Sequence, residues 1–112
     1  MSSELPHVVA RSADTAELHA PVPTLLLELQ TLLGTLAATV AAETNRGRKP
    51  FRPSTEWPER LGDLAYGVYL LADQTGVDIA QAVQSTATRV ANAPRPPTRN
   101  GADQSSDFFN RA

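Results

Sequence analysis

The chain has 112 residues, and its ten basic and twelve acidic side chains are interspersed and give a formal net charge of −2. This pattern offers no concentrated basic face for a phosphate backbone, so nucleic acid is not an expected partner. The absence of cysteine excludes disulfides and thiolate metal sites and favours a reducing compartment. There is no signal-peptide pattern, and no apolar run approaches the roughly 20 residues that span a bilayer. We expect a soluble, cytoplasmic protein with no membrane partner.

The polar ends of the chain limit the predicted domain. Residues 1–22 and 96–112 cannot bury enough apolar surface to offset the entropy of ordering them, so we expect both to be disordered. The remaining domain, residues 23–95, is small enough to bury only roughly 60% of its unfolded surface. Association of copies is the ordinary remedy, and we therefore expect a homodimer or homotetramer.

A first helix is predicted from about Thr24 to Glu43. Its apolar residues recur at intervals of three and four and so gather into one stripe, namely Leu25, Leu26, Leu29, Leu32, Leu33, Leu36 and Val40. Thr24 is the expected N-cap. The stripe is wide, which indicates that this helix contacts more than one neighbour.

A connector from Thr44 to Ser54 follows, and its two prolines and one glycine exclude a helix there. The second helix is predicted to start near Thr55, with Pro58 in its first turn and Gly76 as its left-handed cap.

The third helix is predicted to open at Asp78, with Gln81 completing a capping box, and to end before Pro94. The sequence thus predicts an all-α helical bundle. The first two helices form an antiparallel hairpin, the third closes over them, and oligomerisation completes the bundle.

The segment from Arg60 to Val83, R-L-G-D-L-A-Y-G-V-Y-L-L-A-D-Q-T-G-V-D-I-A-Q-A-V, resembles the second-helix signature of MazG-like nucleotide pyrophosphohydrolases. That signature reads E-L-G-D, an apolar helix, then L-A-D-x-x-G-I-D-L-x-x-A. Upstream, the segment from Leu32 to Val40 lies where the family has E-x-G-E-L-A-E-A. Downstream, Asn92 and Arg95 match an N-x-x-R pair. The resemblance covers about residues 25–95.

The resemblance implies a helical, oligomeric enzyme that cleaves nucleoside triphosphates between the α and β phosphates. It also implies Mg²⁺ as cofactor, held by an E-x-x-E on the first long helix and an E-x-x-D on the second. Residues three apart point the same way from a helix, so two such pairs on facing helices make one cluster of hard oxygen ligands.

This chain departs from that pattern at three of the four acidic positions. Leu32 and Thr35 replace both acids of the first pair, and Arg60 replaces the first acid of the second, which leaves Asp63. We expect the Arg60 guanidinium to pair with Asp63 and to repel a divalent ion. The expected protein is therefore a degenerate relative, a pseudoenzyme that acts as an oligomeric nucleotide-binding or protein-interaction module.

Two sets of residues are candidates for a surviving site. Glu28, Glu59 and Asp63 are the candidate ligands of a relocated metal site, although acids in a first helical turn are also ordinary partners of the helix dipole. The candidates for nucleotide binding are Asn92 and Arg95, with Arg48 and Lys49 of a basic cluster that also includes Arg46 and Arg52.

Two other functions stay open. The chain is either an active Mg²⁺-dependent pyrophosphohydrolase that uses the relocated acids, or a structural helical partner that binds no ligand. A second kind of subunit that donates the missing acids would leave no trace in this sequence.

Overall fold

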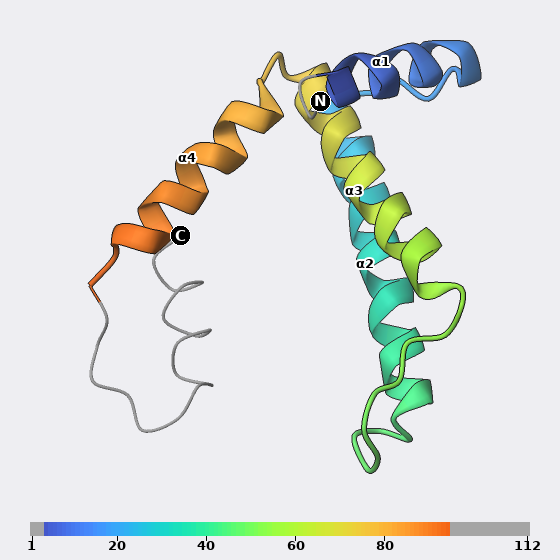
Figure 1. Cartoon of the computed structure of the whole chain (residues 1–112). Helices are drawn as coiled ribbons and strands as arrows, with labels where there is room; N and C mark the ends of the chain where they lie inside the picture. The colour runs from blue at the N-terminus through green and yellow to red at the C-terminus, as the bar shows by residue number, and fades with distance from the viewer. Residues whose placement is uncertain (1–3, 95–112) are drawn as a thin grey trace. The chain divides into compact units, whose positions relative to one another are not determined.

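In the computed structural model, residues 4–94 are described, and they form four α-helices and no strand (Figure 1). The helices are α1 (Leu5–Ala16), α2 (Val22–Glu43), α3 (Trp57–Gln74) and α4 (Ile79–Asn92). The predicted all-α class is therefore confirmed. The chain divides into two compact units, Met1–Ile79 and Ala80–Ala112. Helix α4, apart from its first residue, lies in the second unit, and its predicted closure over the hairpin stays a prediction.

Helix α1 corrects the expectation that residues 1–22 are disordered. Val9 and Ala13 are one turn apart on its face and are 5% and 0% exposed. They pack with Leu25 of α2 and Leu70 of α3 in the core of the first unit. A helix of this length is marginal alone in water, so these contacts stabilise it. The sequence did not predict them, because most residues of this segment are polar.

Helices α2 and α3 pack side by side as the predicted antiparallel hairpin (Figure 1). Helix α2 begins at Val22, with Pro21 as its N-cap residue and no side-chain cap. Thr24 is inside the helix, so its prediction as the N-cap is wrong. A proline is well suited to the first turn of a helix, where backbone N–H groups have no intrahelical partner.

The predicted end of α3 is confirmed. Gly76 has a φ of +71°, the left-handed conformation that glycine adopts without steric cost. The Val77 N–H donates to the Ala72 carbonyl at 2.9 Å, and the Gly76 N–H to the Asp73 carbonyl at 3.3 Å. These bonds pair carbonyl groups that the helix end would otherwise leave open.

At Gly67, leucine side chains of α2 lie close against the backbone of α3. A Cβ atom added there would lie 2.7 Å from Leu29 Cδ2 and 3.4 Å from Leu32 Cδ1. The α3 backbone is therefore in direct contact with leucine side chains of α2, an arrangement that a larger residue at 67 would prevent.

The core of the first unit is small. The buried apolar residues in the described part of the chain are Val9, Ala13, Leu25, Leu70 and Ala72. Within Val22–Glu43, Leu25 is the single buried residue. Leu27 and Leu33 are 64% and 56% exposed. The apolar excess of α2 is thus largely uncovered in one chain.

Helix α2 also corrects the expectation that no apolar run approaches membrane-spanning length. By length and composition alone, this 22-residue helix can cross a bilayer. The core helix of a soluble protein and a signal sequence near an N-terminus pass the same test. The test therefore identifies an unusually apolar helix and does not distinguish among these environments.

Gly67→Val is expected to lower the free energy of unfolding by about 1–3 kcal/mol, because the added methyl groups displace Leu29 and Leu32. Chemical denaturation measures this change. The matched control is Gly62→Val on the same helix, where a Cβ meets no atom within 4 Å. The control should be neutral or slightly stabilising, and equal effects at both positions would contradict the close approach.

Candidate functional site

A hollow of about 110 Å³ lies between α2 and α3 near the end of α1. Most of its lining is apolar, with two carboxylates and one tyrosine; the lining residues are Leu18, Leu25, Glu28, Leu29, Leu32, Asp63, Tyr66, Gly67 and Leu70. Because both helices contribute one acid, this hollow is the place where the described chain brings candidate metal ligands from facing helices together.

The structure unites two of the three acids predicted for a relocated metal site. Glu28 and Asp63 line the hollow, whereas Glu59, in the first turn of α3, is not part of the lining. Within residues 4–94, no group of three or more Asp, Glu, His or Cys side chains is placed to hold a metal ion. One chain therefore offers Mg²⁺ two carboxylates there, and the remaining ligands would have to be water or substrate phosphate oxygens.

The predicted pairing of Arg60 with Asp63 is wrong. The Arg60 Nη2 group donates instead to Glu56 Oε1 at 2.9 Å. Side chains on a helix point toward its N-terminus, so the guanidinium meets the residue four positions earlier. The positive charge of Arg60 therefore lies toward the start of α3. Asp63 does not pair with it and lines the hollow.

The two other departures from the MazG-like pattern have different surroundings. Leu32 lines the hollow and packs near Gly67. Thr35 is exposed, and its hydroxyl donates to the Thr31 carbonyl at 3.0 Å. Neither position supplies a charge, so the first acidic pair of the family pattern has no equivalent in the geometry of α2.

The basic connector is held by a turn around Thr44. This side chain is 8% exposed; its hydroxyl donates to the Val40 carbonyl at 2.8 Å and accepts the Gly47 N–H at 3.0 Å. The Thr44 carbonyl accepts the N–H groups of Arg48 and Lys49 at 2.8 and 3.0 Å. Both basic side chains are exposed and neither lines the hollow.

The other predicted nucleotide ligands lie outside the first unit, which contains the hollow. Asn92 is the last residue of α4, in the second unit, and is exposed. Arg95 lies outside the described residues. The proposed amide and guanidinium pair therefore stays a prediction from the sequence.

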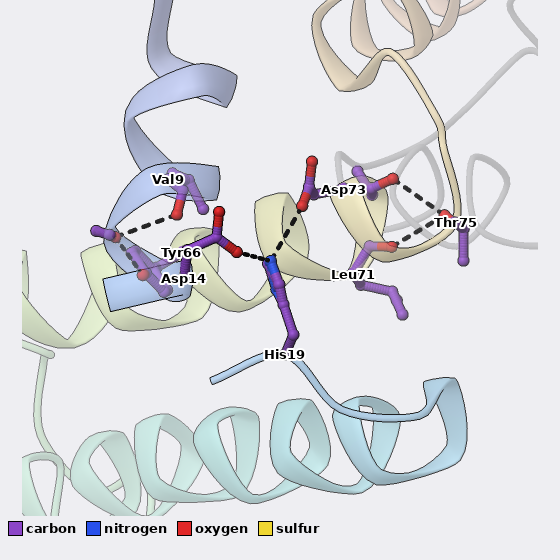
Figure 2. Close-up of polar contacts among 9 residues, drawn as sticks. Val9, Asp14, His19, Tyr66, Leu71, Asp73 and Thr75 are labelled. Atoms are coloured by element: carbon purple, nitrogen blue, oxygen red, sulfur yellow. Dashed lines mark hydrogen bonds and ion pairs between the residues drawn. The ribbon is translucent and has the colours of Figure 1, made fainter. Parts of the chain in front are cut away.

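Sequence reasoning missed a polar cluster that joins α1 to α3 (Figure 2). His19, in the turn before α2, places Nε2 at 3.1 Å from Asp14 Oδ1 and 3.3 Å from Asp73 Oδ2. The hydroxyls of Ser12 and Tyr66 share a hydrogen bond nearby. No motif signals these pairs, because their members come together only when α1 packs on α3.

In comparisons with protein-family models, with curated proteins and with solved structures, no match to this chain was found. The resemblance to MazG-like enzymes therefore stays a prediction from the residues quoted above.

Thr44→Val should lower the free energy of unfolding by about 1–2 kcal/mol, because it leaves the Gly47 N–H without its buried acceptor. Amide exchange should quicken at residues 45–49 in particular. Thr35→Val is the matched control, since its exposed hydroxyl also donates to a carbonyl four residues earlier. A similar loss in both variants would show that Thr44 has no special part in the connector.

Proposed function

We propose that the chain is an oligomeric helical interaction module on a MazG-like scaffold, and that α2 is the surface on which a second copy docks. The observation that carries the proposal is the exposure of Leu27, at 64%, and of the small residues that share its side of a helix with a single buried residue. Large apolar side chains in contiguous exposed patches mark interaction surfaces. A cytoplasmic homodimer or homotetramer fits this surface.

The face of α2 turned away from α3 suits a helix from another copy. Helical spacing places Leu27, Thr31, Gly34 and Ala38 together on it, and all four are exposed. Small residues allow two helix backbones to approach closely, and the leucine fills the space beside them. Gly34 has no atom near the position of a Cβ, which leaves room for the partner.

Two threonine hydroxyls on the exposed part of α2 are already paired within the helix. The hydroxyls of Thr31 and Thr35 donate to the carbonyls of Leu27 and Thr31 at 3.2 and 3.0 Å. Burial of Thr31 and Thr35 against a partner therefore leaves neither of their hydroxyl hydrogens unpaired, and an unpaired buried hydroxyl is the usual free-energy cost of covering threonine.

A second copy is favoured as the occupant because one chain buries so little. Among residues 4–94 no large side chain is fully buried. A chain of this size ordinarily needs an added source of stability when its own core is limited. A symmetric pairing of α2 with α2 extends the core of both copies at once, and a two-fold axis makes one apolar face complementary to itself.

The second candidate function is Mg²⁺-dependent hydrolysis of nucleoside triphosphates. Its support is the hollow, where Glu28 and Asp63 line one cavity. Magnesium bound through one or two carboxylates and substrate phosphates is a common arrangement. We prefer the interaction module without catalysis, because Leu32 and Thr35 supply no charge and because the described residues bring no third metal ligand to the hollow. A purely structural partner that binds no ligand is the remaining alternative.

The double variant Leu27→Glu/Ala38→Glu should weaken self-association by about tenfold or more, because both charges would be buried at the face of α2 that carries these two exposed residues. Sedimentation velocity over a concentration series measures the assembly, and circular dichroism checks helicity. Val77→Glu, at an exposed position in the turn after α3, is the matched control and should assemble as the unmodified protein does. A monomeric unmodified protein that co-sediments with lipid vesicles would contradict the proposal and assign the face to a membrane.

Titration with nucleoside triphosphates, with and without Mg²⁺, separates the degenerate module from the enzyme. The same samples are assayed for pyrophosphate, and we expect no release. Magnesium-dependent release that falls at least about tenfold in Glu28→Gln and in Asp63→Asn would establish the second candidate. Glu59→Gln is the control, because Glu59 does not line the hollow. Binding without release would support a nucleotide-binding module.

A further inference from the structure

The connector after α2 concentrates positive charge at one end of that helix. Residues 44–55 contain no acidic residue and four basic ones, all exposed, which are Arg46, Arg48, Lys49 and Arg52. The N–H groups of Arg48 and Lys49 donate to the Thr44 carbonyl at 2.8 and 3.0 Å. This basic segment is therefore held directly at the C-terminal end of α2.

The acids beside the connector do not cancel its charge. Glu43 is the last residue of α2, and Glu56 follows the connector. The Glu56 carboxylate accepts the hydrogen bond from Arg60 at 2.9 Å. Because Glu56 is already paired with Arg60, one further acid stands beside four basic side chains, and this end of α2 is positive.

The opposite end of α2 is acidic. Residues 12–45 contain no lysine or arginine, and Arg11 on α1 precedes them. Glu17 is exposed in the turn before α2. The Asp14 and Asp73 side chains lie on either side of His19 and are 72% and 42% exposed, so both carboxylates stay accessible at this end.

We propose that two copies pair their α2 helices in antiparallel orientation, with the basic connector of each copy against the acidic turn of the other. This inference rests on the proposed function, because it assigns the orientation and the charged contacts of the same α2 face. A parallel pair would place connector beside connector and turn beside turn, so like charges would meet. The antiparallel pair makes both contacts attractive, and it also opposes the two helix dipoles.

The apolar face of α2 favours the same orientation. Its exposed residues are Leu27, Thr31, Gly34 and Ala38. A two-fold axis between Thr31 and Gly34 sets Leu27 of each copy opposite Ala38 of the other, so a large side chain meets a small one twice. A parallel pair would instead set leucine against leucine and alanine against alanine, which leaves the helices further apart at one end than at the other.

Reversal of charge at the connector tests the pairing in the full chain. Arg48→Glu/Lys49→Glu should raise the dimer dissociation constant about tenfold at about 0.1 M NaCl, because four attractive charges in each dimer become repulsive. At about 0.5 M NaCl the change should fall to about twofold or less, since added salt screens exposed charges. Sedimentation velocity over a concentration series measures the constants.

A further charge change separates contacts between copies from effects within one chain. Adding Glu17→Lys to the connector variant should lower the dissociation constant at least about threefold. Most of α2, which has 22 residues and is about 33 Å long, separates Glu17 from the connector. Charges at the two sites are screened from each other within one chain, so recovery reports a contact between copies. Glu4→Lys, at the exposed start of α1, changes the net charge equally and should not restore association.

Single cysteines report the orientation directly, because the chain contains none of its own. After air oxidation, an equimolar mixture of Leu27→Cys and Ala38→Cys should form disulfides between unlike chains. Disulfides between like chains alone would overturn the antiparallel pairing, as would an unchanged dissociation constant after connector reversal. The dimer, and with it the proposed function, would survive either result. A monomeric unmodified protein would overturn both proposals.

Discussion

The contact between α2 and α3 at Gly67 is the constraint on which the first unit depends. With no side chain at this position, Leu29 lies directly on the α3 backbone, and the two helices approach closely along this seam. Glu28 is adjacent to Leu29, and Asp63 lies one turn before Gly67, so the same contact brings both acids to one hollow. Helix α1 then packs beside the seam, where Leu25 and Leu70 receive Val9 and Ala13.

The same packing explains why one chain is an incomplete structure. A helix contacts a single neighbour along only part of its circumference, and α3 uses that part of α2. Leu27 and the small residues Gly34 and Ala38 on the opposite side stay exposed. The hydroxyl groups of Thr31 and Thr35 nearby are paired with carbonyl groups of the same helix. The threonine hydroxyls beside this face donate within the helix, so they do not require hydrogen bonds to water. This is the physical basis for proposing that a second copy covers the face.

Positions 32, 35 and 60 were predicted from the sequence to differ from an acidic metal-binding pattern, and the structure shows what surrounds each of them. Leu32 and Thr35 both lie within helix α2. The Arg60 guanidinium donates to Glu56 and not to Asp63. The hollow is lined by Glu28 and Asp63, and the described residues bring no group of three candidate metal ligands together. The same packing of α2 against α3 forms the hollow and sets which acids line it.

The sequence by itself determined the helices with long, regular apolar periodicity, the break at the connector, the cap at Gly76 and the hairpin of the two main helices. These follow from local spacing and from the conformational limits of proline and glycine. Helix α1, the partner of Arg60, the union of Glu28 with Asp63 and the contacts of His19 were decided by tertiary structure. Each depends on which side chains meet across helices, and a short amphipathic stripe or a lone histidine has no local signal that specifies its distant partner.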